Sequence, residues 1–176
     1  MLSTLRNAWK VPELRKRFLW TIFLVAIFRI GIHIPVPGID TSALSTLTES
    51  GGLLSFYNLI SGGAFTKASI LALSVSPYIN ASIIMQLLTI AIPSLEQLSK
   101  EGEEGRKKIQ SITRYVSIGI ACVLALGVYS TIANLGATSG VGTLEKIVVI
   151  FSLVVGSTFC MWLGDQITQK GFGNGV

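Results

Sequence analysis

Long uncharged stretches dominate the pattern of hydrophobic and polar positions along the chain. Three of them, residues 70–92, 115–135 and 147–163, are close to or above the roughly 20 residues with which an α-helix crosses a bilayer. A fourth, residues 18–34, is interrupted only by Arg29 and follows a basic cluster. A secretory signal peptide fits this stretch poorly, because Arg29 breaks its apolar core and no small-residue cleavage site follows the core. The pattern predicts an all-α integral membrane protein with four transmembrane helices.

Basic residues orient the predicted bundle, since short loops rich in lysine and arginine stay in the cytoplasm. Residues 1–17 and residues 93–114 hold five basic residues each, whereas residues 35–69 and 136–146 hold one each. We therefore expect the first two segments to be cytoplasmic and the other two to be external, with a further cytoplasmic segment at residues 164–176. This topology places the N-terminus in the cytoplasm.

The N-terminal segment itself alternates between apolar and basic positions. Leu2, Leu5 and Trp9 recur at helical spacing between basic residues, a pattern that suits an amphipathic helix on the inner membrane surface. A frayed amphipathic terminus fits the same pattern equally well.

Composition agrees with a membrane protein and narrows its chemistry. Half of the residues are hydrophobic and 13% are charged, against about 25% charged residues in a soluble domain. The net charge of +5 follows the predicted topology, and glutamates dilute the basic loop at residues 93–114, so direct nucleic-acid binding is not expected. Cys122 and Cys160 lie inside apolar runs, and His33 is the single histidine, which leaves no metal cluster and no catalytic triad.

The apolar stretch at residues 53–65 needs a special position in this topology. The predicted span at residues 70–92 already supplies the crossing from outside to inside, so the stretch stays on the outer side. It is too apolar for a solvated loop and too short to span, and Gly62 and Gly63 interrupt it. We expect a half-inserted, re-entrant helix, because non-spanning backbone at membrane depth must be buried in protein or line a wet cavity. A cap helix on the outer surface is the alternative.

The second predicted span contains a helix start within its apolar run. Ser76 followed by Pro77 is typical of an N-cap and first helical position, which predicts a break near residues 74–76. At 100° per residue one face collects Val75, Ile79, Ser82, Gln86 and Thr89. This face is apolar on the outer side and polar on the inner side. It resembles one wall of a funnel-shaped pore that is wet on the inner side and closed by an apolar constriction. Interhelical hydrogen bonding by Gln86 and Asn80 is the alternative interpretation.

Two further features of the spans are expected to be structural. Arg29 lies about one turn from the outer end of its span, where snorkelling or a carbonyl partner satisfies its charge. Small residues recur every four positions in the third and fourth spans, which predicts close helix packing. They are Ser117, Ala121 and Ala125 in the third span and Gly156, Cys160 and Gly164 in the fourth.

Several short stretches, in this order and spacing, resemble the amino-terminal part of the SecY family, the central subunits of bacterial protein translocation channels. They are FRIG (residues 28–31), IPVPG (34–38), SGGA (61–64), PYI (77–79), ASII (81–84), QLLT (86–89), KEGE (100–103), WLGDQIT (162–168) and GNG (173–175). Each stretch alone is weakly specific, whereas the series is highly specific and runs through nearly the whole chain. The resemblance implies a partial SecY-type helical bundle with a re-entrant plug helix.

The resemblance also implies roles for individual residues. Residues 53–66 would form the plug that closes the outer funnel at rest, through Leu53, Leu54, Phe56, Tyr57, Leu59, Ile60, Gly62, Gly63 and Phe65. Val75 and Ile79 would belong to a pore ring of aliphatic side chains. The polar residues Asn80, Ser82, Gln86 and Thr89 would face the lateral gate or the pore.

Partners and location follow from the same resemblance. It implies the membrane subunits SecE and SecG, and the SecA ATPase or a ribosome on the cytoplasmic face. The location would be the bacterial cytoplasmic (inner) membrane, where a translocating polypeptide or signal peptide would pass through the channel or leave sideways into the lipid bilayer. No bond would be made or broken, so no enzyme activity and no cofactor are expected.

Members of the family have ten spans in two halves of five, and four spans cannot enclose the pore. We therefore expect the sequence to be a fragment or one piece of a split channel. Half of a small-solute transporter or ion channel would also contain a broken helix, but it would need mid-membrane coordination, and the spans contain no acid. An intramembrane enzyme would need paired carboxylates or a Ser/His pair, which the spans lack.

Overall fold

The computed structural model describes residues 11–42, 44–45, 53–134, 136, 142–171 and 175. Its helices are α2 (Pro12–Gly31), α4 (Leu53–Ile60), α5 (Ser76–Ala91), α6 (Pro93–Lys100), α7 (Glu103–Asn134) and α8 (Thr143–Lys170). Within the described residues the only β pairing is an isolated antiparallel bridge between Pro35 and Ser69. The expected all-α fold is confirmed in this part of the chain.

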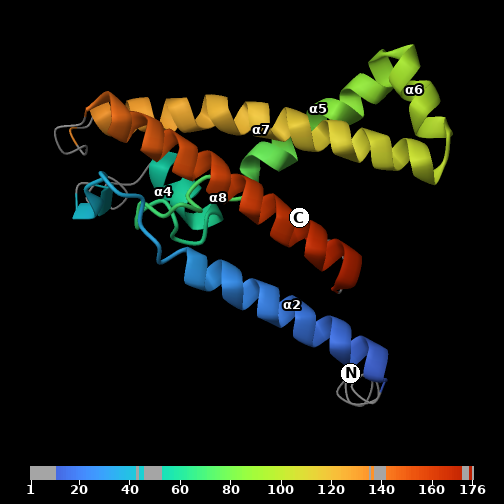
Figure 1. The fold of residues 1–176 in the computed structure, drawn as a ribbon, viewed down its shortest axis with the longest axis horizontal. Coiled ribbons are helices and arrows are strands. Elements are labelled where there is room, and N and C mark those ends of the chain that lie inside the picture. Colours follow the sequence, from blue (N-terminus) through green and yellow to red (C-terminus); the bar gives the residue numbers. More distant parts are fainter. Residues whose placement is uncertain are drawn as a thin grey trace.

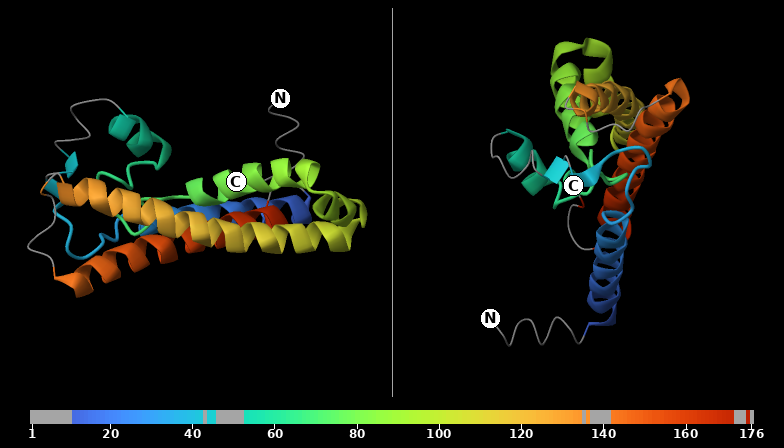
Figure 2. Two further views of the ribbon diagram at one scale, coloured as in Figure 1. Left: turned by 90° about the horizontal axis from the view of Figure 1, so that it is seen from above. Right: turned by 90° about the vertical axis from the view of Figure 1, so that its left-hand side faces the viewer.

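The long helix α7 forms the centre of the bundle. Both α5 and α8 pack against α7, while α2 packs against α8 (Figure 1). A bend of 101° separates α5 from α6, and α6 contacts α7. The start of α2, the α6 bend and the end of α8 lie toward one end of the bundle, and α4 lies toward the other (Figures 1 and 2). That the end with α6 is the cytoplasmic one stays a prediction from the basic residues.

Small side chains let α7 and α8 approach closely. Ser117, Ala121 and Ala125 of α7 are all buried. Ala121 and Ala125 belong to one core cluster with Val149 and Leu153 of α8. The three small residues of α8, which are Gly156, Cys160 and Gly164, are buried as well.

Two helices, α7 and α8, are long and apolar enough to cross a membrane, and the bent pair of α5 and α6 counts as a third if it is one span. The first predicted span lies in α2, which does not meet this criterion. Every stretch of 18 residues within α2 contains four basic residues, namely Arg15, Lys16, Arg17 and Arg29. The described chain is thus a multi-pass membrane protein, and a crossing by α2 remains a prediction.

The helices do not coincide with the uncharged stretches. α2 begins six residues before the predicted span at residues 18–34 and ends at Gly31. The expected loop at residues 93–114 is largely helical, because it contains α6 and the first turns of α7. Helix α8 also extends beyond the predicted span at both ends, so it contains parts of the expected loops at residues 136–146 and 164–176. Charged residues such as glutamate and lysine are good helix formers, so helices continue past the apolar boundary.

One expected helix cap is wrong. Ser76 is the first residue of α5 instead of its N-cap, which is Val75, and no side chain caps the helix. Pro77 stands within the first two helical positions, where its missing N–H leaves no hydrogen bond unmade.

The expected amphipathic helix of the N-terminus falls mainly on residues 1–10, which lie outside the described residues. Residues 137–141 and 172–174 also lie outside them.

Candidate functional site

The segment between α4 and α5 is fastened to the end of α2. The amide of Val36 donates to the carbonyl of Ala68 at 2.8 Å, and the amide of Ile70 donates to the carbonyl of Ile34 at 3.1 Å. The buried hydroxyl of Ser69 donates to the carbonyl of Gly31 at 3.0 Å. These bonds satisfy backbone groups that no helix or sheet would otherwise pair. They join the segment that leads into α5 to the end of α2.

Helix α4 lies within the predicted plug at residues 53–66. It is followed by Gly62 and Gly63, which both have positive φ and turn the chain back. The side-chain oxygen of Asn58 accepts from the amide of Thr66 at 3.0 Å, and Phe65 is buried. The exposed apolar side chains of α4 are Phe56 (63% exposed), Leu59 (77%) and Ile60 (57%). The side chains of Leu53, Leu54 and Tyr57 lie outside the described residues.

Basic residues at the end of α2 contact the same outer segment. Arg29 donates from Nη1 to the carbonyl of Gly62 at 3.2 Å, a carbonyl partner of the kind expected for this charge. Lys67 Nζ lies 2.8 Å from His33 Nε2, and His33 Nδ1 lies 2.9 Å from the carbonyl oxygen of Arg29. An ammonium group only donates, so Nε2 accepts from Lys67 and Nδ1–H donates to the carbonyl. Arg29 and His33 therefore link α2 to the chain after α4.

The chain is broken just before α5. Ser74 has a φ of 51°, in the left-handed region that side chains other than glycine rarely adopt. Val75 follows and lines an apolar groove of about 210 Å³, whose walls include Leu24 of α2 and Cys160 of α8. Ile79 stands one turn further along and is 41% exposed. The break lies where the sequence predicts it, and it separates Val75 from the regular part of the helix.

The polar part of the predicted face lines a second groove. Ser82, Gln86 and Thr89 of α5 share this groove of about 270 Å³ with polar residues of α6 and α7, which are Ser99, Arg106, Gln110 and Thr113. Gln86 donates to the hydroxyl of Ser82 at 3.3 Å, and the hydroxyl of Thr89 donates to the carbonyl of Gln86 at 2.7 Å. Asn80 is exposed and does not line the groove. The structure thus brings together the three polar residues of the face and places Asn80 elsewhere.

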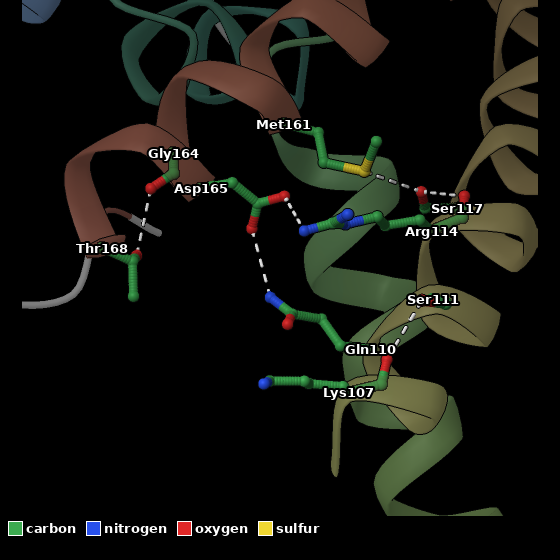
Figure 3. A network of polar contacts seen from close by, with 9 residues as sticks. All are labelled: Lys107, Gln110, Ser111, Arg114, Ser117, Met161, Gly164, Asp165 and Thr168. Atoms are coloured by element: carbon green, nitrogen blue, oxygen red, sulfur yellow. Dashed lines mark hydrogen bonds and ion pairs between the residues drawn. The ribbon is translucent and has the colours of Figure 1, made fainter. Parts of the chain in front are cut away.

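The sequence interpretation missed an ion pair beside this groove. Arg114 Nη2 of α7 lies 2.8 Å from Asp165 Oδ2 of α8 (Figure 3), and the Asp165 side chain is 9% exposed. The Gln110 amide donates to Asp165 Oδ1 at 3.4 Å. A signal was present, because Arg114 and Asp165 flank the inner ends of two consecutive spans. Consecutive antiparallel helices place such ends at the same level, where opposite charges meet.

The polar and the apolar residues of the candidate site differ in their affinity for water. Among the described residues no group of three or more His, Cys, Asp or Glu side chains could hold a metal ion. The polar groove combines hydroxyl and amide groups with one cation, Arg106. Such groups are readily hydrated, whereas the apolar side chains of α4 and Ile79 exclude water from what they cover.

Comparison with known proteins identifies relatives of the chain. The SecY family model matches residues 69–176. The Escherichia coli K12 protein translocase subunit SecY is 44% identical over 170 residues, which cover 93% of this chain and 38% of the relative. The SecY subunit of Aquifex aeolicus is 39% identical over 185 residues, which cover 100% of this chain and 43% of the relative. The chain therefore spans about two fifths of the length of these relatives.

A solved structure shows the same arrangement of helices. Sec61 in the canine ribosome–channel complex from the endoplasmic reticulum matches 97% of this chain and 38% of its own, with a TM-score of 0.63 and 22% identity. At this level of identity the match shows the fold alone.

Proposed function

This chain belongs to the SecY family, and on that premise we propose that it is the N-terminal part of the pore-forming subunit of a protein-conducting channel. In this role it helps to pass unfolded secretory polypeptides across the membrane and to release apolar segments into it. The observation that carries the proposal is the family match over the broken helix α5 and the helices that frame it. The comparisons give no support to half of a solute transporter.

We assign the plug to residues 53–66 and the pore ring to Val75 and Ile79. The exposed apolar side chains of α4 support the first assignment, because they need cover that the described part of the chain does not give them. The second is supported by the position of both ring residues at the start of α5, directly after the left-handed Ser74. In this arrangement branched side chains seal around a passing polypeptide.

The polar residues of α5 are assigned to the inner funnel and the lateral gate. Ser82, Gln86 and Thr89 line the polar groove between α5 and α7, which supports a wet surface on the inner side of the ring. Asn80 is exposed outside that groove and is assigned to the gate. Arg29 is assigned a structural role, because it holds the carbonyl of Gly62.

We further propose a location and partners. The location is the bacterial cytoplasmic membrane with the N-terminus inside, supported by the basic residues near the start of α2. SecE and SecG are the proposed membrane subunits, and the SecA ATPase or a ribosome is the proposed cytoplasmic partner. The partner drives transport, so the chain itself catalyses no reaction.

Cysteine crosslinking tests the pore assignment. In channels that contain this chain, Val75→Cys and Ile79→Cys should crosslink to a polypeptide stalled during translocation, because both side chains touch the passing chain. Ala125→Cys is the matched control, since Ala125 is fully buried in the core of the bundle. Equal crosslinking at all three positions, measured on gels, would show that the two residues do not form the ring.

Deletion of the plug tests the second assignment. Removing residues 53–66 should raise ion conductance through the resting channel in planar bilayers, because the apolar cover of the outer opening is lost. The fastening of residues 68–70 to α2 lies outside the deletion, so the remaining channel should still assemble. Unchanged conductance in a correctly assembled channel would contradict the plug assignment.

A further inference from the structure

Residues 64–70, here called the root of α4, connect this helix to the rest of the bundle. The side chains of Ala64 and Phe65 are buried, and Phe65 belongs to the core cluster that includes residues of α7 and α8. The amide of Ser69 donates to the carbonyl of Ala64 at 2.9 Å, and residues 68–70 are bonded to the end of α2. A swing of α4 that leaves these contacts intact therefore requires a hinge before Ala64.

The backbone can form this hinge at Gly62 and Gly63. Their φ angles are 67° and 87°, and α4 ends at Ile60, just before them. Glycine adopts such angles and rotates more freely than other residues, because it has no Cβ atom. Rotation about ψ of Gly62 or φ of Gly63 turns the planar peptide unit between them, which contains the carbonyl of Gly62. A contact that holds this carbonyl therefore restricts the hinge.

Arg29 makes such a contact from α2. Its Nη1 donates to the carbonyl of Gly62 at 3.2 Å. Arg29 lies in the last turn of α2, and the end of this helix is bonded to the root through the hydroxyl of Ser69. The nearby side chains of Val25 and Ile30 on α2 are apolar, and they are 48% and 68% exposed. A charged group among such side chains is costly in a membrane without a partner, which favours the bond to Gly62.

Two further hydrogen bonds cross the hinge within the outer segment, and both involve Asn58 of α4. The carbonyl of Asn58 accepts from the amide of Gly63 at 2.9 Å, and its side-chain oxygen accepts from the amide of Thr66 at 3.0 Å. These bonds join α4 to the chain after the hinge, whereas the bond of Arg29 joins the hinge to α2. A swing of α4 about the hinge breaks the bonds of Asn58, so hydrogen exchange of the two amides reports this motion.

We propose that Arg29 is a positioning residue that fixes the hinge of the plug: by holding the carbonyl of Gly62, it keeps α4 in the position that closes the channel. This inference rests on the proposed function, because it treats residues 53–66 as the plug. A swing of α4 requires the bond of Arg29 to break, whereas the bond between Lys67 and His33 lies in the root and remains. Loss of the guanidinium thus shifts the resting channel toward its open state while the bundle stays folded.

Removal of the guanidinium tests the proposal. In channels that contain this chain, Arg29→Met should raise the resting ion conductance about tenfold, as for the loss of one weak hydrogen bond from a charged group. Arg29→Lys should raise it by less, because an ammonium group can also donate to a single carbonyl. The amount of folded channel in detergent should stay unchanged, since Arg29 is exposed and the backbone bonds between α2 and the root remain.

Lys146→Met is the matched control. It removes one positive charge at an exposed position on α8, and it should leave the conductance unchanged. An equal rise in Lys146→Met and Arg29→Met would show that the net charge, and not the bond to Gly62, controls the leak. A leak as large in Arg29→Lys as in Arg29→Met would also overturn the proposal.

Two measurements separate the role of Arg29 from the plug assignment. Hydrogen exchange of the amides of Gly63 and Thr66 should be faster in Arg29→Met than in the parent channel, while exchange within α7 stays the same. In the channel without residues 53–66, Arg29→Met should raise the conductance no further, because the acceptor of its bond is gone. A rise in conductance after the deletion but not in Arg29→Met would overturn only the role of Arg29. Unchanged conductance after the deletion would overturn the plug assignment and, with it, the role of Arg29.

Discussion

Substitution of Arg114 by leucine should lower the free energy of unfolding by about 4 kcal/mol, because it leaves the carboxylate of Asp165 buried without its cation. Removal of the other partner by Asp165→Leu should lower the free energy of unfolding by less. The Asp165 side chain is 9% exposed, whereas the Arg114 side chain is 37% exposed, so an unpaired guanidinium regains water more easily. Denaturant titration of the purified channel in detergent measures both values.

The double variant provides the control for this prediction. Arg114→Leu with Asp165→Leu removes both charges and should recover most of the lost stability, because two apolar side chains replace a buried ion pair at little cost. If the double variant is as unstable as the sum of the single variants, packing and not charge pairing explains the effect. A larger loss for Asp165→Leu than for Arg114→Leu would contradict the argument from exposure.

Alanine at Gly156 should destabilise the chain by about 3 kcal/mol, through the overpacking of a site that has no space. A Cβ atom at Gly156 would overlap the backbone carbonyl of Ile70, whose carbon would lie 2.6 Å away. Ile70 cannot move freely, because its amide is bonded to Ile34 at the end of α2. The substitution therefore forces α8 away from the segment that leads into α5. The same detergent titration measures the loss.

Gly119→Ala is the matched control for this change. Gly119 lies in the middle of α7, and a Cβ atom there would meet nothing within 4 Å. Alanine should raise stability there by about 0.5 kcal/mol or more, because it reduces the backbone freedom of the unfolded chain. Similar losses at Gly156 and Gly119 would mean that the close approach of α8 to Ile70 does not matter for folding.

The sequence predicts those features of the fold that depend on local chemistry. The start of α5 at Ser76 follows from Pro77, and the end of α4 follows from Gly62 and Gly63. The buried small residues of α7 and α8 follow from their spacing. Hydropathy gives the ends of the helices poorly, since α7 begins at Glu103 within a charged segment. A hydropathy pattern reports where the membrane lies, and the helix continues beyond it.

Contacts between distant segments could not be predicted in this way. The partner of Arg29 is a backbone carbonyl, that of Gly62, and no sequence pattern distinguishes one carbonyl from another. The contacts of Gln110 and Arg114 with Asp165 join two helices, α7 and α8, whose relative rotation depends on packing. Within the candidate site, the face of α5 was predicted from helical periodicity, but Val75 and the polar residues line different grooves.

The backbone bridge that fastens residues 34–36 to residues 68–70 turns residues 37–67 into a closed loop, and α4 lies within this loop. The entropy lost in closing such a loop depends on its length and not on where α4 sits. Moving α4 therefore breaks its local contacts and the bond of Arg29 to Gly62, while the bridge and the helices on either side stay in place. The arrangement allows residues 53–66 to move without any unfolding of the bundle to which they are attached.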